Sequence, residues 1–281
     1  MLRLRDIQRR FDRAAPHFDG ADFVHTVTRD GLVGRLEPLL LQPQTILDLG
    51  SATGATGRML RRRFKRAHVV SLDLSRAMLS AARKSKRWFS RSTFVQADAG
   101  QLPFADESFD MVVANQLLPW TPDPQVVFEQ VSRVLKKDGV FAFATLGPDS
   151  LREIAKAWAA IDDRAHVNPF PDMHDIGDGL VRAGLRDPVL DVDRLQVSYE
   201  SPDRLFADLT RAGARNALAG RGRGLVSRRR FKVMTDTLAS GRADGKIVLD
   251  LELVYGHCWG GGPRNDPMNY KIAADRIPLR G

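Results

Sequence analysis

The stretch Ile46-Leu47-Asp48-Leu49-Gly50-Ser51-Ala52-Thr53-Gly54 joins an apolar strand to a turn of small residues, and a helical pattern follows it. Small residues let backbone N–H groups approach a ligand closely, and the N-terminus of the next helix adds the positive end of its dipole. A glycine turn alone is weak evidence, because many α/β proteins need one merely to turn the chain. The strands that follow therefore decide what this turn does.

Three further strand candidates end in polar residues. The second ends in Ser71-Leu72-Asp73-Leu74-Ser75. Its acidic residue lies about 20 positions after the turn, where a carboxylate can accept hydrogen bonds from both hydroxyl groups of a ribose. The third ends in Gln96-Ala97-Asp98-Ala99, where Asp98 can accept a hydrogen bond from the amino group of an adenine. The fourth ends in Asn115-Gln116-Leu117-Leu118, opposite the turn, where we expect the order of the strands to reverse.

Apolar runs alternate with helical patterns across residues 45–146, which predicts an α/β fold with helices on both faces of a parallel sheet. The predicted strands are 45–50, 68–74, 93–97, 109–115 and 139–146, and the predicted helices are 54–64, 75–85 and 123–135. Ser75 and Asp123 are placed as N-caps, and Gly139 is expected to end the last of these helices.

The flanking regions are predicted to be mainly helical. Residues 7–40 form a helical pattern with breaks expected at Gly20 and Gly31. A helix over 150–162, a loop over 168–172 and a helix ending near Gly184 come after the core. Strands over 189–199 and 246–255 enclose a mostly helical stretch, 202–240.

Composition limits the classes of function. The 281 residues are 43% hydrophobic and 27% charged, as in soluble globular proteins, and no uncharged apolar run reaches the roughly 18 residues of a membrane span. The single cysteine, Cys258, fits a reducing compartment such as the cytoplasm, and the histidine spacing predicts no metal site. Lys and Arg outnumber Asp and Glu by 43 to 34, which favours an acidic partner, but charge alone does not choose among a protein, a nucleic acid and an anionic small molecule.

The four strand ends together resemble class I S-adenosylmethionine (SAM)-dependent methyltransferases over residues 44–147. The resemblance implies a Rossmann-like sheet of seven strands, mostly parallel with one antiparallel strand, and SAM as the cofactor. Ala52 stands where the family usually has its middle glycine, and its methyl group is small enough to be tolerated while narrowing the pocket. A dinucleotide-binding dehydrogenase would instead place its glycines as G-x-G-x-x-G.

The resemblance also implies the cofactor-binding residues. The turn is expected to hold the methionine part, Asp73 the ribose and Asp98 the adenine. The full set of expected cofactor residues is Asp48, Gly50, Ser51, Ala52, Gly54, Asp73, Leu74, Met78, Asp98, Ala99, Asn115 and Leu117.

Motifs beyond the cofactor core resemble the malonyl-acyl carrier protein O-methyltransferases of biotin synthesis. They are Phe11-Asp12-Arg13-Ala14-Ala15-Pro16-His17-Phe18-Asp19, Gln101-Leu102-Pro103-Phe104, Thr145-Leu146-Gly147-Pro148-Asp149-Ser150-Leu151, Ala157-Trp158, His166-Val167-Asn168-Pro169-Phe170 and Gly213-Ala214-Arg215-Asn216. That family methylates the free carboxyl of a malonyl thioester, which masks it for extension by fatty-acid enzymes.

Alternative functions remain open. Stretches 175–177, 182–185 and 192–199 are similar to complex I assembly factors of the arginine-hydroxylase type, and we favour the methyltransferase branch over that one. A scaffold protein that keeps the fold, or a methyltransferase acting on RNA, is a further alternative, although no RNA-recognition module is visible and nucleic acid is not the expected partner.

The favoured reaction needs no general base, because a carboxylate is already a nucleophile at neutral pH, so no catalytic residue is named. Catalysis rests on positioning and on excluding water. A buried carboxylate needs a cationic or hydrogen-bonding partner, preferably arginine. The expected substrate-binding residues are Arg13, Phe18, Arg164, His166, Arg211 and Arg215. The family often has tyrosine at the position of Phe18, so the role of that position is in doubt without the hydroxyl.

A basic run lies in the helical stretch between the last two strands. Residues 211–232 hold eight Lys or Arg and no acidic residue, which predicts docking of an acidic acyl carrier protein. The expected docking residues are Arg221, Arg223, Arg228, Arg229 and Arg230. We divide the chain into an N-terminal helical lid (1–41), a SAM-binding core (42–200), a basic helical insertion that acts as a lid (201–245), the last core strand (246–260) and a tail (261–281).

Overall fold

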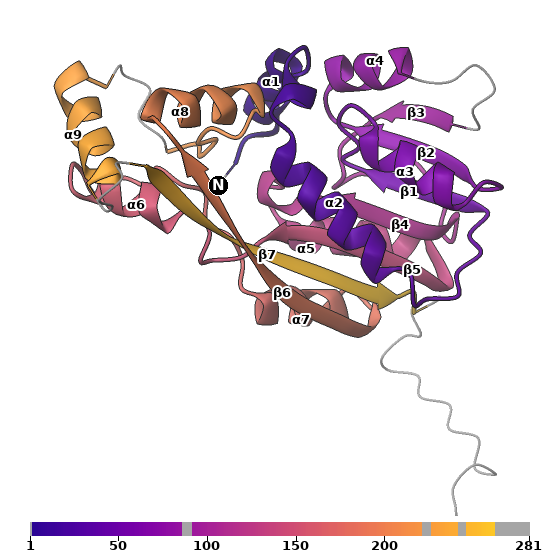
Figure 1. Ribbon diagram of the computed structural model, residues 1–281. Helices are drawn as coiled ribbons and strands as arrows, with labels where there is room; N and C mark the ends of the chain where they lie inside the picture. Colours follow the sequence, from indigo (N-terminus) through magenta and orange to yellow (C-terminus); the bar gives the residue numbers. More distant parts are fainter. Residues whose placement is uncertain (1, 86–91, 221–225, 241–245, 262–281) are drawn as a thin grey trace, which may run out of the picture.

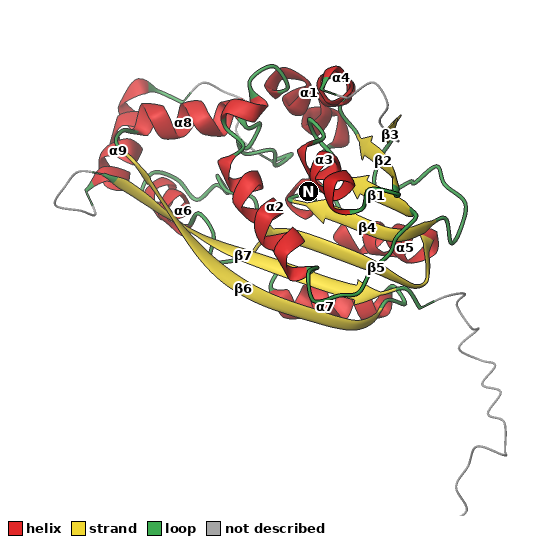
Figure 2. Cartoon of the chain, turned by 45° about the vertical axis from the view of Figure 1, so that its right-hand side comes forward, coloured by secondary structure: helices red, strands yellow, loops and turns green. Residues whose placement is uncertain are grey.

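The computed structural model describes residues 2–85, 92–220, 226–240 and 246–261. Within them a seven-stranded sheet has the order β3-β2-β1-β4-β5-β7-β6 (Figures 1 and 2). Its strands are β1 (Thr45–Leu49), β2 (His68–Asp73), β3 (Ser92–Gln96), β4 (Phe109–Asn115), β5 (Leu135–Leu146), β6 (Arg186–Tyr199) and β7 (Ile247–Trp259). β7 runs antiparallel to both of its neighbours, and the remaining pairings are parallel. The expected fold class, a mostly parallel sheet with one antiparallel strand, is confirmed.

Helices cover both faces of the sheet. They are α1 (Leu4–Ala14), α2 (Phe23–Arg35), α3 (Ala55–Arg63), α4 (Arg76–Lys84), α5 (Pro124–Val134), α6 (Arg152–Ala159), α7 (Met173–Arg182), α8 (Pro202–Arg211) and α9 (Arg228–Ala239), with short 3-10 turns η1 (Phe18–Gly20) and η2 (Leu118–Trp120). Side chains alternate between the two faces of a strand, so Ile46 packs in the core beneath α2 and α3, while Leu47 packs in the core beneath α5 and α7. This two-sided burial explains the nearly continuous apolar strands.

The order of the strands reverses between β1 and β4, because the chain first builds the β1, β2 and β3 side and then returns to the other side of β1. In open α/β sheets a ligand crevice forms beyond the carboxyl ends of the strands at such a point. Ser75 and Asp123 act as N-caps, as expected: their side chains accept hydrogen bonds from the backbone N–H groups of Met78 and Gln125. The caps fix where α4 and α5 begin beside this crevice.

Two expected boundaries are wrong. Gly139 does not end a helix: α5 already ends at Val134, because β5 starts at Leu135 by pairing with Phe109 of β4. Gly31 does not break a helix, because α2 continues through it. A Cβ atom at Gly31 would lie 2.5 Å from the Tyr255 hydroxyl oxygen, so glycine is there to let α2 approach β7.

A smaller core lies beyond the sheet. Buried residues of α6, α8, α9 and the first part of β7 pack together, among them Trp158, Leu205 and Met234. Figures 1 and 2 show β6 and β7 extending past the other strands to reach these helices. Because α8 follows β6 and α9 precedes β7, both helices emerge at the carboxyl edge of the parallel strands. α6, which we assigned to the core segment, shares this smaller core with the two helices of the insertion.

Candidate active site

A cavity of about 310 Å³ lies at the carboxyl ends of β1, β2, β3 and β4. Eight of the expected cofactor residues line it: Gly50, Ala52, Asp73, Leu74, Asp98, Ala99, Asn115 and Leu117. The N-terminal segment covers it through Leu4, Ile7, Phe11 and Phe18. We call this the cofactor cavity.

The turn after β1 is held in a left-handed backbone conformation. Its φ values are +75° at Gly50, +46° at Ala52 and +80° at Gly54. An L-residue with a side chain pays on the order of 1 kcal/mol for this conformation, which explains why glycine suits position 52 and why alanine is still accepted there. The backbone N–H groups of Gly50 and Ser51 both donate to the Leu72 carbonyl at 2.9 Å, which ties the turn to β2.

Asp73 joins the turn to α4. One of its carboxylate oxygens accepts the Ala52 N–H at 2.8 Å, and the other accepts the Ser75 N–H at 2.8 Å. Burial raises the pKa of Asp73 to about 6 even though these two hydrogen bonds lower it, and the nearby Asp12 carboxylate adds to the rise. A carboxylate oxygen can accept more than one hydrogen bond, so Asp73 keeps acceptor capacity on the side that faces the cavity.

Four expected cofactor residues do not line the cavity: Asp48, Ser51, Gly54 and Met78. Asp48 lies beneath the turn with 1% of its surface exposed, and burial raises its pKa to about 7, against a lowering hydrogen bond from the Gly57 backbone. Met78 is fully buried against α1 and η1. These residues support the turn instead of forming the cavity wall.

Asp98 lies near the start of the loop after β3. One of its carboxylate oxygens accepts the Gly100 N–H at 2.9 Å, which orients the side chain at the cavity wall. Together with Asp73 it places two acidic groups along one wall, from β2 to β3, and Asp123 is a third acidic residue in the lining. This donor and acceptor set fits an adenosine with a cationic sulfonium attached, because hydroxyl and amino groups donate to carboxylates and the cavity bears negative charge.

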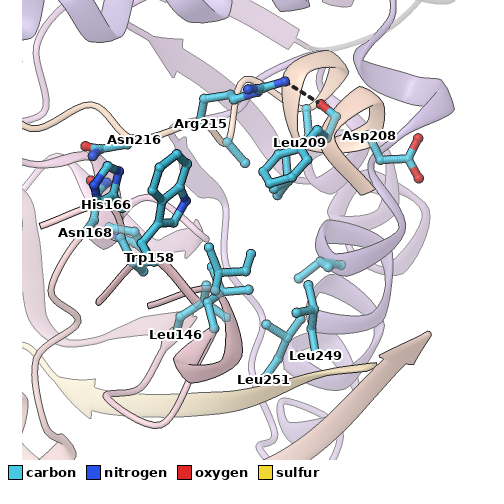
Figure 3. A pocket seen from close by; sticks show the side chains of 18 of the residues that line it. Leu146, Trp158, His166, Asn168, Asp208, Leu209, Arg215, Asn216, Leu249 and Leu251 are labelled. Atoms are coloured by element: carbon cyan, nitrogen blue, oxygen red, sulfur yellow. Dashed lines mark hydrogen bonds between the residues drawn. The ribbon is translucent and has the colours of Figure 1, made fainter. Parts of the chain in front are cut away.

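A second cavity, of about 480 Å³, lies between the sheet and the helices of the smaller core. Figure 3 shows its walls, with Leu146, Leu249 and Leu251 on one side and Trp158, Leu209 and Arg215 around them. We call it the long cavity. Most of its lining is apolar, and many of its polar groups come from the loop after α6 and from the segment after α8. Others are contributed by Arg10, His25, Gln116, Tyr199, Asp208 and Arg230.

A stacked and hydrogen-bonded group forms part of the wall of the long cavity. The His166 ring lies parallel to the Trp158 indole with 3.9 Å between their centroids, as Figure 3 shows. His166 Nε2 lies 2.7 Å from Asp162, whose other oxygen accepts the Arg230 guanidinium at 2.8 Å. The interaction with His166 lowers the pKa of Asp162. α9 is thereby tied to the loop that borders the cavity.

The two cavities share His25, Gln116 and Trp120 in their linings. We call the place where these three residues lie the junction. Burial lowers the pKa of His25 to about 4, with a further contribution from Arg29, so the ring is neutral at physiological pH. An electrophile held in one cavity and a nucleophile held in the other can meet here.

The expected substrate residues lie in several places. Arg164, His166 and Arg215 line the long cavity, and Phe18 lines the cofactor cavity. Arg13 and Arg211 line neither cavity, and Arg211 lies 3.9 Å from Asp208 on its own helix. The Arg215 guanidinium already donates to the Thr210 hydroxyl and to the Phe206 carbonyl, at 2.8 and 3.1 Å. None of these arginines lines both cavities, and an arginine at the reacting carboxylate stays a prediction.

The expected docking residues divide as well. Arg221 and Arg223 lie outside the described residues. Arg228 and Arg229 are exposed in the first turn of α9, whereas the Arg230 guanidinium donates hydrogen bonds to the Asp162 carboxylate and the Ile161 carbonyl.

Sequence reasoning missed the junction. His25 lies in a helix with no local motif, and Gln116 lies between Asn115 and Leu117, which were both expected to bind the cofactor. Only its position after β4, at the reversal of the sheet, pointed to Gln116. Among the described residues no group of His, Cys, Asp or Glu is arranged to hold a metal ion. Nor does any helix in the described ranges have the length and apolar character to cross a membrane.

Comparisons with known proteins agree with this geometry. A family model described as a methyltransferase domain matches residues 47–143. The malonyl-[acyl-carrier protein] O-methyltransferase of Laribacter hongkongensis is 42% identical over 257 residues, which are 89% of this chain and 86% of that protein.

Solved structures show the same fold. The YcgJ protein of Bacillus subtilis is 16% identical and superimposes with a TM-score of 0.59 over 83% of this chain and 98% of that one. The phosphoethanolamine N-methyltransferase 2 of Haemonchus contortus, in complex with SAM, is 20% identical and has a TM-score of 0.53 over 84% of this chain and 52% of that one.

Proposed function

Because the chain belongs to the family of malonyl-[acyl-carrier protein] O-methyltransferases, we propose that it methylates the free carboxyl group of a malonyl thioester carried by acyl carrier protein. It is a SAM-dependent methyltransferase of class I fold. The observation that best supports this acceptor is the meeting of two cavities at the junction, one fitting the cofactor and a larger one, of about 480 Å³, available to a thioester arm. As the sequence resemblance implied, the methyl ester would mask the carboxyl during synthesis of the biotin precursor.

We assign the cofactor cavity by its polar groups. In this assignment Asp73 accepts hydrogen bonds from the ribose hydroxyls, Asp98 accepts one from the adenine amino group, and the turn at Gly50 and Ala52 borders the methionine part. When bound, SAM supplies an electrophilic methyl group on a positively charged sulfur. α1 and η1 close this cavity, since the Asp19 carboxylate accepts the Thr53 hydroxyl at 2.6 Å and the Asp12 carboxylate accepts the Ser75 hydroxyl at 2.6 Å.

The long cavity positions the acceptor. Its apolar walls exclude water from the thioester arm, and water is the competing nucleophile that the site has to keep out. The malonyl carboxylate is ionised at neutral pH, so no side chain has to remove a proton from it. Holding one carboxylate oxygen in line with the methyl group is the main task of the protein.

The proposed acceptor is tested with small thioesters that lack the carrier. Purified protein with methyl-labelled SAM should methylate malonyl-N-acetylcysteamine and leave acetyl-N-acetylcysteamine unlabelled, since the acetyl compound has no free carboxylate. Labelling of both compounds, or of neither, argues against a carboxylate acceptor.

We further propose that α9 docks the carrier, which is an acidic protein. Arg228 and Arg229 are exposed, directly precede Arg230, which lines the long cavity, and have no acidic residue in the first turn of their helix. Long-range attraction between exposed charges speeds encounter and weakens as salt is added, with a range of about 10 Å at 0.1 M. Arg230 is left out of this surface, because its ion pair with Asp162 holds α9 in place.

Reversing both charges, Arg228→Glu with Arg229→Glu, should lower kcat/KM for malonyl-carrier protein by roughly tenfold at low salt. The loss should shrink as ionic strength rises, and kcat at saturation should stay unchanged, because the variant affects encounter and leaves the junction intact. Steady-state kinetics over a range of salt concentrations measures this.

A matched control reverses Lys65 and Arg66, two exposed cations after α3, which lies far from α9 in Figure 1. This control should keep the kcat/KM of the parent protein. The small malonyl thioester should be methylated equally by all three proteins. An equal loss on both substrates would place α9 at the catalytic centre, and an unchanged kcat/KM with lost RNA binding would favour a nucleic-acid partner.

A further inference from the structure

Gln116 is a buried amide with an unused hydrogen-bond donor. The residue is 5% exposed, and within the described part of the chain its Nε2 atom has no hydrogen-bond partner. Leaving a buried donor unpaired is unfavourable, so such groups in native proteins call for a specific explanation. Gln116 lines both the cofactor cavity and the long cavity. The missing partner is therefore to be sought in a ligand that reaches the junction.

The backbone of Gln116 is unfavourable as well. Its φ is +57°, a left-handed conformation that is uncommon for residues other than glycine. The surrounding structure holds it there, because its backbone N–H donates to the Ala144 carbonyl at 2.7 Å and η2 begins two residues later. Strained residues of this kind cluster at ligand sites, where the strain aims a side chain. Gln116 thus combines two unfavourable features at the junction, an unpaired buried donor and a left-handed backbone.

We propose that the Gln116 side-chain amide donates a hydrogen bond to the carboxylate of the malonyl group and holds it at the junction. The inference rests on the proposed function, since it assigns the group that recognises its acceptor. The neighbouring amide is not available for this role, because Asn115 Nδ2 already donates to the His25 carbonyl at 2.9 Å. His25 is neutral and adds no positive charge beside the carboxylate.

A neutral donor suits this reaction better than an arginine. The carboxylate loses its negative charge as it forms the ester bond, so a cation in contact with it would stabilise the reactant more than the transition state. An amide orients the oxygen while removing less of its nucleophilic character. This agrees with the placement of Arg164 and Arg215, which line only the long cavity.

The test compares two thioesters in the same protein. Gln116→Met keeps the length of the side chain and removes both polar atoms, so kcat/KM for the small malonyl thioester should fall about 10- to 30-fold. Affinity for S-adenosylhomocysteine, measured by calorimetry, should stay within twofold. A second comparison uses inhibitors. A thioester whose malonyl carboxylate is replaced by an N-methyl amide resembles the methyl ester product, and it should inhibit the parent protein more strongly than the acetyl thioester does. In Gln116→Met the two compounds should inhibit equally.

Gln125→Met is the matched control. Gln125 also has a buried amide atom without a partner in the described structure, its Oε1, but it lies on α5 and lines neither cavity. It should keep the parent kcat/KM. Gln116→Asn is the second variant, because asparagine tolerates a left-handed backbone and its amide is shorter by one methylene. It should fold and still lose most of the kcat/KM that Gln116→Met loses.

Each outcome decides the inference. A kcat/KM within twofold of the parent in folded Gln116→Met overturns it while leaving the proposed function in place. An equal loss in Gln125→Met, or a parallel loss of S-adenosylhomocysteine affinity, makes Gln116 a structural residue and also overturns it. If the parent protein itself does not methylate the malonyl thioester, the proposed function fails, and the inference fails with it.

Discussion

Asp73→Asn is expected to weaken the binding of S-adenosylhomocysteine by roughly 100-fold, which corresponds to about 3 kcal/mol. The asparagine keeps the volume of the side chain but loses the charge and one acceptor oxygen, and the two N–H groups of Ala52 and Ser75 compete for the oxygen that remains. The ribose hydroxyls then lack an acceptor. Calorimetry at pH 8 measures the change in affinity.

The variant should fold, because burial already raises the pKa of Asp73 to about 6 and a neutral amide avoids the unfavourable buried charge. Asp110→Asn is the matched control. Asp110 accepts hydrogen bonds from the Gln44 and Thr45 backbone and pairs with Lys136, but it lies at the start of β4, at the opposite edge of the sheet. Its substitution should lower the melting temperature and leave the affinity unchanged. An unaltered affinity in Asp73→Asn would remove Asp73 from the cofactor site.

Asp48→Asn is expected to raise the free energy of unfolding at pH 8 by on the order of 4 kcal/mol. Burial raises the pKa of Asp48 from 3.8 to about 7, and one of its carboxylate oxygens has no partner in the described structure. Between about pH 4 and pH 7 the folded protein keeps a proton that the unfolded chain has released. The free energy of unfolding of the parent protein therefore falls as pH rises through this window.

The asparagine variant binds no proton at this position in either state, so this contribution is absent from its pH profile. The two proteins should be equally stable below pH 4 and should diverge as pH rises towards 8. Urea unfolding at several pH values measures the difference. A constant difference across the whole range would mean that Asp48 does not titrate in this window.

Features that depend on local pattern could be predicted from the sequence. The five strands of residues 45–146 are predicted within a few residues, because a strand buried on both faces is a short apolar run between turns. Asp73 and Asp98 line the cofactor cavity as expected, because the ends of parallel strands meet at one edge of the sheet.

Features that depend on tertiary contacts could not be predicted. The pairing of Phe109 with Leu135 ends α5 at Val134 and places Gly139 inside β5, and the close approach of Tyr255 explains why position 31 within α2 is glycine. The junction brings together residues 25, 116 and 120 from α2, the loop after β4 and η2, and no spacing in the sequence marks it. An arginine was expected at the carboxylate because charge pairing is the simplest partner, and that expectation stays a prediction beside our proposal of the Gln116 amide.

The most direct test of the proposed function is methyl transfer to the carrier-bound substrate itself. Malonyl-carrier protein, acetyl-carrier protein and carrier protein without an acyl group are incubated with the enzyme and methyl-labelled SAM, and the intact mass of each carrier is then measured. The proposal predicts one added methyl group on the malonyl-carrier protein only, located on the terminal carboxyl. Methylation of the carrier without an acyl group, or no methylation of any of the three, would contradict it.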